Sequence, residues 1–160
     1  KLDGRLPLGP YGTAATEEIK SLVLSMVENC ATYSVRPVGP DPTPLSVSLS
    51  DGVMLQGEVA GLQAADGVIG MVKATKRHEE DRQELALRLM MAVAAGLDVR
   101  KGVAIHVNER DVTKSTPRLV YLGPDIDRSE AAARLSGMQH LMTRAASTPM
   151  ASFGRATPRA

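Results

Sequence analysis

Apolar residues recur at intervals of three and four along the first part of the chain. The set comprises Ile19, Leu22, Val23, Met26, Val27 and Cys30. This spacing predicts an amphipathic helix, which Thr13 or Thr16 would cap and which would end near Ala31. The following segment, residues 37–44, contains four prolines. Because proline fixes its backbone torsion and lacks an amide donor, this segment is predicted to be a connector.

A change of period after the connector predicts strands. Apolar residues and serines alternate over residues 45–50, which is typical of a strand with one solvent-exposed face. An Asp-Gly pair at residues 51–52 would form a hairpin turn that leads into a second strand over residues 53–62. A further turn at residues 65–67 would lead into a third strand over residues 68–74. We therefore expect three consecutive strands in an antiparallel meander.

The pattern becomes helical again over residues 78–95. A wide apolar face follows three acidic residues, and acidic side chains suit the positive end of a helix dipole. This acidic start is interpreted as solvent-exposed, and Gly96 is a suitable residue for the end of the helix. Mostly apolar runs over residues 102–107 and 118–122 predict two more strands.

A final helix is predicted over residues 127–146, with Asp127 or Ser129 as its cap. The element order is then helix, three strands, helix, strand, strand, helix, without an internal repeat. The helix between the third and fourth strands can act as a crossover, which is the connection that parallel strands require. We predict an α/β fold with a mixed β-sheet flanked by helices, in one domain over residues 1–160.

Composition excludes several classes of function. Aromatic residues make up 2% of the 160 residues, which disfavours a single-strand binder that stacks bases on rings. The formal charge of +1 gives no attraction of the whole domain to phosphate. The longest uncharged apolar run, residues 89–97, is far shorter than the roughly 20 residues of a membrane span. The lone Cys30 is interpreted as a core residue and fits a cytoplasmic location. The start at Lys1 suggests an excised fragment of a larger chain.

The strand over residues 57–62, the strand after it and the helix that follows are typical of a PD-(D/E)XK nuclease. Such a nuclease carries a metal-binding Asp near Ala60 and an acid at Met71, two residues before Lys73. Only Lys73 is present. The pattern therefore predicts a nuclease-like shape with no catalytic residue, no metal ligand and no cofactor. Glu58 could act as a displaced ligand, although an ordinary cross-strand ion pair with Lys73 is the preferred interpretation.

Lys73, Lys76 and Arg77 form the one compact basic group and could contact a DNA backbone. The alternative, a solvated helix entry, is favoured because acidic residues follow at once. Residues 78–81 cannot converge on one metal ion, since consecutive helical residues point in different directions. His106 and His140 have no partner at ligand spacing, so ordinary core or surface roles are expected.

Several segments together resemble the C-terminal domain of RecC, the gamma subunit of exodeoxyribonuclease V. They are residues 6–12 (LPLGPYG), 57–59 (GEV), 82–95, 122–124 (LGP) and 129–131 (SEA). The resemblance extends from about Gly4 to Pro149. It implies a degenerate PD-(D/E)XK fold that does not cut DNA itself, within a helicase-nuclease complex that repairs double-strand breaks.

The resemblance also implies RecB-like and RecD-like subunits as partners, DNA contact through the full complex, and no membrane. The expected role is that of a structural and interaction domain without catalysis. Two alternatives stay open. One is an active metal-dependent nuclease with displaced ligands, and the other is an unrelated α/β binding module.

Overall fold

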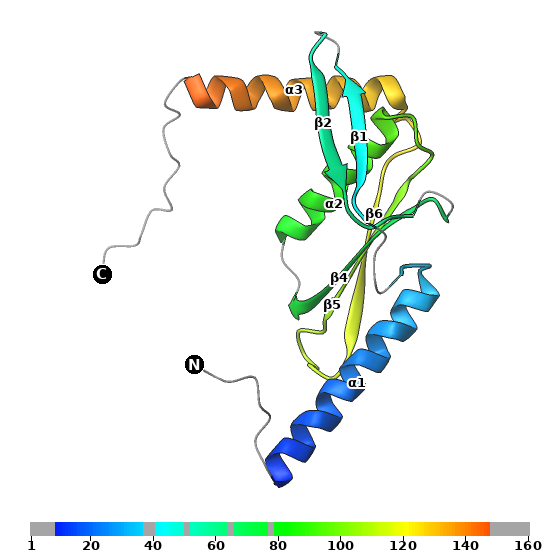
Figure 1. Cartoon of the computed structure of the whole chain (residues 1–160), viewed down its shortest axis with the longest axis vertical. Coiled ribbons are helices and arrows are strands. Elements are labelled where there is room, and N and C mark those ends of the chain that lie inside the picture. Colours follow the sequence, from blue (N-terminus) through cyan, green and yellow to red (C-terminus); the bar gives the residue numbers. More distant parts are fainter. Residues whose placement is uncertain (1–8, 37–40, 50–51, 64–65, 77–78, 148–160) are drawn as a thin grey trace, which may run out of the picture.

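The computed structural model describes residues 9–36, 41–49, 52–63, 66–76 and 79–147 (Figure 1). The elements in chain order are α1 (Pro10–Thr32), β1 (Thr43–Ser48), β2 (Met54–Val59), β3 (Leu62–Gln63), β4 (Val68–Lys76), α2 (Glu79–Ala94), β5 (Lys101–Val107), β6 (Ser115–Tyr121) and α3 (Arg128–Ser147). The predicted turn residues 51 and 65, together with Arg77 and His78, lie outside the described residues.

Four strands form a mixed sheet in the order β3-β4-β5-β6. β4 and β5 are parallel, and α2 is the crossover between them, as predicted. β3 pairs antiparallel with β4, and β6 pairs antiparallel with β5. In the parallel pair Lys73 lies opposite His106, which places both residues near the carboxyl ends of their strands.

The predicted three-stranded meander is wrong. β1 and β2 form a separate two-stranded sheet, and the expected strand over residues 53–62 breaks after Val59. The cause is Gly61, whose φ of 73° turns the chain and whose carbonyl accepts a 2.8 Å hydrogen bond from the Gly70 amide. A Cβ on Gly61 would lie 1.9 Å from the Gly70 carbonyl oxygen. Only glycine allows this approach of β3 to β4.

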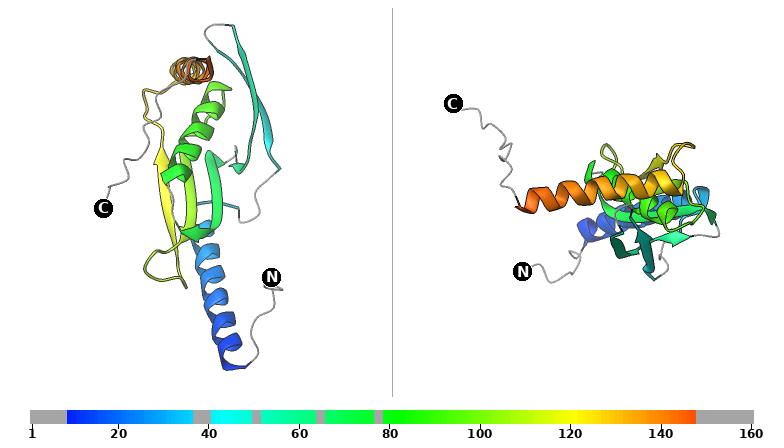
Figure 2. Two further views of the ribbon diagram at one scale, coloured as in Figure 1. Left: turned by 90° about the vertical axis from the view of Figure 1, so that its left-hand side faces the viewer. Right: turned by 90° about the horizontal axis from the view of Figure 1, so that it is seen from above.

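The helices cover both faces of the four-stranded sheet. α2 lies between one face and the β1–β2 hairpin (Figure 2), where Leu85 and Leu89 pack against Ile69, Met71 and Val59. α3 packs on α2 and on the hairpin in a second apolar cluster. The C-terminal part of α1 covers the opposite face, where Met26 and Cys30 pack against residues of β4 and β5.

The helix ends follow local chemistry, with one correction. α1 begins at Pro10, earlier than predicted, because a proline in the first turn has no amide hydrogen that needs a partner. Thr13 and Thr16 lie inside the helix and donate back to carbonyls four residues earlier. At α3 the Asp127 carboxylate accepts a 2.8 Å hydrogen bond from the Glu130 amide, which confirms its capping role. Among the described residues no helix is long and apolar enough to cross a membrane.

Candidate functional site

Lys73 points from β4 toward the first turns of α2 and binds two carboxylates there. Its Nζ donates to Asp81 Oδ1, and it lies 3.4 Å from Glu84 Oε2. The Lys73 side chain is 36% exposed, whereas Asp81 is 5% exposed. The hydrogen bond to Asp81 is the largest cause that raises the pKa of Lys73 above its usual value. The ammonium group is therefore charged and held in place at neutral pH.

Arg88 extends this contact to the end of β2. Its Nη2 pairs with Glu84 Oε1, and its Nη1 donates a 2.9 Å hydrogen bond to the Ala60 carbonyl oxygen. Glu84 thus bridges Lys73 and Arg88. Asp81, Glu84 and Arg88 share one face of α2 because residues spaced by three or four lie on the same side of a helix. We call Lys73, Asp81, Glu84 and Arg88 the charged centre, which has two positive and two negative groups.

His106 closes the buried side of the charged centre. It lies opposite Lys73 in the sheet register and is 1% exposed. Its Nδ1 is 3.7 Å from Asp81 Oδ2. The prediction that the acidic start of α2 is solvent-exposed is therefore wrong for Asp81, which packs inward against β4 and β5. Core or surface roles were expected for both histidines, and the structure buries His106 and leaves His140 exposed on α3.

Glu79 at the start of α2 makes a second link between the helix and the sheet. Its Oε2 accepts a 2.8 Å hydrogen bond from Arg118 Nη2 on β6. The Arg118 guanidinium is the largest cause that lowers the pKa of Glu79 below its usual value. This pair lies at the solvent, so its contribution to stability is small.

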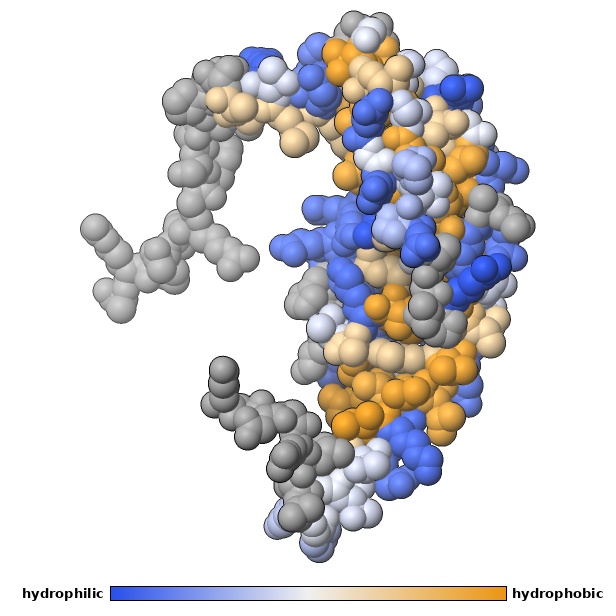
Figure 3. All heavy atoms as spheres, viewed as in Figure 1, coloured by the Kyte–Doolittle hydropathy of each residue, from blue (hydrophilic) through white to orange (hydrophobic). Residues whose placement is uncertain are grey.

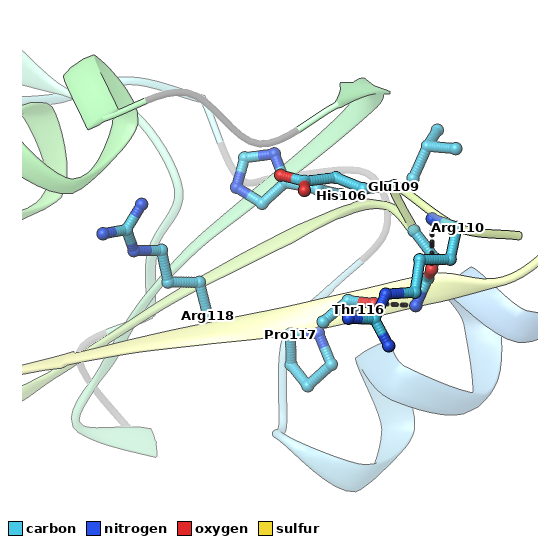
Figure 4. Close-up of a pocket in the computed structure, with 8 residues that line it drawn as sticks. His106, Glu109, Arg110, Thr116, Pro117 and Arg118 are labelled. Carbon is cyan, nitrogen blue, oxygen red and sulfur yellow. Dashed lines mark hydrogen bonds between the residues drawn. The ribbon is translucent and has the colours of Figure 1, made fainter. Parts of the chain in front are cut away.

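A cavity of about 320 Å³ lies beside these groups, where β5 leads into β6. It is lined by His106, Val107, Asn108, Glu109, Arg110, Thr116, Pro117 and Arg118. Figure 4 shows the His106 ring and the Arg118 guanidinium on the same side of the two strands. Because charges of both signs line the cavity, it offers no uniform field for an anion such as phosphate.

The residues that the sequence suggested as a site lie in different surroundings in the structure. Ala60 and Lys73 are connected through Arg88 and Glu84, whereas Met71 is buried in the core. Glu58 is exposed on β2 opposite Pro44. The preferred ion pair of Glu58 with Lys73 is therefore wrong, because β2 does not pair with β4 and Lys73 binds α2.

The structure describes only part of the basic group that the sequence suggested for DNA binding, namely Lys73, Lys76 and Arg77. Lys73 belongs to the charged centre, and Lys76 is the last residue of β4. The Lys76 side chain and the whole of Arg77 lie outside the described residues. Within the described part of the chain, no group of three or more potential ligands could hold a metal ion.

Asp81, Glu84 and Arg88 are parts of one site that the sequence pattern alone does not predict. A signal was present, since their spacing of three and four residues places them on one helix face. What the spacing does not give is the element that this face meets. That depends on the pairing of β4 with β5, which brings Lys73 and His106 to the same helix turns.

These features define an α/β domain whose parallel strand pair and crossover helix enclose a charged centre. The model of the RecC C-terminal domain family matches residues 1–157, and the chain belongs to this family. Membership implies a RecC-like subunit of exodeoxyribonuclease V, in the context of DNA repair and of a complex with other subunits. No curated protein and no solved structure was found to match the chain.

Proposed function

We propose that this chain is a structural and interaction domain without catalysis, within a RecC-like subunit that takes part in recombinational repair of DNA double-strand breaks. The charged centre is the observation that carries the proposal. The resemblance would make Lys73 the counterpart of a nuclease lysine, and in this chain its ammonium binds two carboxylates from α2. Arg88 places a second cation against the carbonyl of Ala60, where a nuclease would carry its metal-binding Asp.

Electrostatics explains why this arrangement suits a structural role. A divalent cation near Ala60 would face the positive groups of Lys73 and Arg88, and the carboxylates of Asp81 and Glu84 are already paired with these two groups. Magnesium needs an open set of oxygen ligands in near-octahedral geometry. The carboxylates of the charged centre are instead used to tie α2 to β4 and to the end of β2.

The proposed partners are RecB-like and RecD-like subunits in the cytoplasm, with DNA contact made through the full complex. Two observations support the proposal that DNA contact is made through the full complex. The net charge of the chain is small, and Lys73 is already paired within the charged centre. Few phosphates would be neutralised by this domain alone, so its own DNA binding would be weak and sensitive to salt.

A nuclease assay separates this proposal from an active nuclease with displaced ligands. The purified chain is incubated with linear single- and double-stranded DNA in magnesium and in manganese, and no cleavage is expected. Lys73→Ala and Glu58→Gln serve as matched controls. Metal-dependent cleavage that either substitution abolishes would overturn the proposal. Cleavage that is equal in all three proteins comes from a copurifying nuclease and leaves the chain itself inactive.

A further inference from the structure

β6 is the last strand of the four-stranded sheet, so one of its edges faces away from the other strands. Figure 2 shows this strand, in yellow, at one side of the sheet. Two hydrogen bonds show which backbone groups point outward. The Asn108 amide donates to the Lys114 carbonyl over 2.8 Å, and the Leu122 amide donates to the Arg100 carbonyl over 3.1 Å. Because the register between them is continuous, the even-numbered residues of β6 bond to β5, and the odd-numbered ones direct their N–H and C=O groups outward.

α1 covers one end of this edge and confirms the assignment. The Ser115 amide donates to Ser25 Oγ over 2.9 Å, and Asn29 Nδ2 donates to the Ser115 carbonyl oxygen over 3.4 Å. Both backbone groups of Ser115 therefore point away from β5, and side chains of α1 bond to them. Pro117 is the next outward residue, and it offers only a carbonyl because proline has no amide hydrogen.

The edge beyond Pro117 lacks the usual protection of a sheet edge. The outward N–H and C=O groups of Leu119 and Tyr121 have no hydrogen-bond partner within the part of the chain that the structure describes. Natural edges are commonly protected by charged side chains, by bulges or by very short strands, as at the other edge of this sheet, where β3 has two residues. β6 has seven residues, and its one charged side chain, Arg118, lies on the α2 side, where it binds Glu79.

The side chains along this edge are apolar on one face. Leu119 is 38% exposed and Tyr121 is 62% exposed. They lie opposite Val103 and Lys101 in the register, which places them on the face of the sheet that α1 covers. Figure 3 shows hydrophobic side chains gathered over the middle of α1. Lys101 is the single charged residue of β5 and β6 on this face, so an acidic side chain on a neighbouring segment is favoured there.

We propose that the edge of β6 from Pro117 to Tyr121 is a docking site for an extended segment of another subunit, which adds a strand to the sheet. The backbone determines this occupant. Donors and acceptors that recur about 7 Å apart along an edge match a second strand, whereas a helix has already bonded its own backbone groups. The segment places apolar residues beside Leu119 and Tyr121 and an acidic residue toward Lys101.

The source of the segment in another subunit rests on the proposed function, and membership of the family supports it because such a subunit works in a complex. The nuclease assay and the tests of strand addition measure different properties. Either proposal can therefore fail while the other holds.

Amide hydrogen exchange tests the pairing directly, in the full-length subunit alone and in its complex with the partner subunits. The amides of Leu119 and Tyr121 should exchange rapidly in the free subunit and about tenfold or more slowly in the complex. The amides of Arg118 and Val120 bond to β5 and should be slow in both states, which makes them the matched control. Slow exchange of Leu119 and Tyr121 in the free subunit, or no added protection in the complex, would overturn the proposal.

Leu119→Pro separates backbone pairing from side-chain contact. Proline removes the outward amide and leaves the ladder with β5 intact, as Pro117 does two residues earlier. Affinity for the purified partner subunits is measured by titration. We expect a loss of about tenfold or more for Leu119→Pro and about threefold for Leu119→Ala. Equal losses would contradict a role of the amide. If far-UV circular dichroism shows Leu119→Pro to be unfolded, the exchange measurement on the natural chain still decides.

A photo-crosslinking residue at position 121 identifies the occupant in the assembled complex. The expected crosslink joins β6 to an extended segment of another subunit that has apolar residues at alternate positions and an acidic residue among them. A crosslink to a helix, to a second copy of this chain or to DNA, or no crosslink at all, would overturn the proposal. The same residue at position 112 is the matched control, because Val112 is 52% exposed in the connection between β5 and β6, and it should give no crosslink.

Discussion

Breaking the contact between Lys73 and Asp81 tests whether the charged centre stabilises the fold. We expect Lys73→Met to lower the free energy of unfolding by about 2 kcal/mol. Loss of one partner from a fully buried ion pair costs about 3–5 kcal/mol. The expected cost is smaller here because the Lys73 side chain is 36% exposed, so water screens part of the remaining Asp81 charge.

A double-mutant cycle with Asp81→Asn isolates the interaction itself. Each single change leaves one charged partner behind, whereas the double variant removes both charges. The double variant should therefore be less destabilised than the sum of the single variants, by about 1–2 kcal/mol. The exposed pair of Glu17 and Lys20 is the control, with both side chains 64% exposed. The same cycle there should give about 0.5 kcal/mol or less.

Urea unfolding followed by far-UV circular dichroism is the suitable assay, because the chain has no tryptophan and three tyrosines. For a chain of this length, a loss of about 2 kcal/mol lowers Tm by about 4–8 °C. Single effects that add to within about 0.5 kcal/mol would refute the reasoning. Lys73 and Asp81 would then stabilise the fold independently of each other.

Two further predictions concern pH and the backbone. Because the pKa of Lys73 is raised in the folded chain, its stabilisation is complete below the unfolded value near 10.5 and is lost as the pH rises through the folded value. Urea unfolding below and above this pH should show that the free energy of unfolding of the natural chain falls as the pH rises. Lys73→Met should lack this fall. Gly61→Ala should cost about 3 kcal/mol or more, since φ is 73° and the new Cβ would meet the Gly70 carbonyl. Gly52→Ala, at φ 78° in open space, should cost about 1–2 kcal/mol in the same unfolding assay, and equal losses would contradict the close-approach argument.

The helices and the central strands follow from local patterns in the sequence. α2 has the bounds expected from its apolar period, and Gly96 ends it with φ 91° and a 2.9 Å hydrogen bond to the Val93 carbonyl. β4 and β5 are parallel because a helix of that length crosses between them. Each of these features depends on residues that are close in sequence, so periodicity and end signals suffice to predict them.

Two features depend on contacts between distant residues. One is the separation of the β1–β2 hairpin from the four-stranded sheet, and the other is the charged centre. The break before β3 is set by the approach of Gly61 to Gly70, which no periodic pattern encodes. The charged centre needs the register of β4 with β5 and the rotation of α2, and both are results of core packing. The strand pattern in the sequence is enough to single out Lys73, whereas its partners on α2 are set by the fold.

Met71 tests whether position 71 serves the core, as the proposed structural role requires. It lies two residues before Lys73 on the same side of β4, and the proposed nuclease-like fold predicts an acid at this position in an active enzyme. It is 7% exposed and packs in the apolar cluster with Leu85 and Leu89. A carboxylate there would lose its hydration without a built partner, so Met71→Glu should cost about 3 kcal/mol or more, or roughly 6–12 °C in Tm.

Met71→Leu is the matched control, because it keeps the position apolar at similar volume and should cost less than about 1.5 kcal/mol. Thermal unfolding of the two variants decides between two accounts of this position. If Met71→Glu is as stable as Met71→Leu, the α2 side of β4 can accommodate a carboxylate beside Lys73. Lys73 would then have to leave Asp81 and Glu84 to bind that carboxylate. The paired arrangement of the charged centre, which supports a structural role, would be only one state of the site. If Met71→Glu unfolds at a much lower temperature, position 71 serves the core, and the fold and a metal ligand compete for the same side chain.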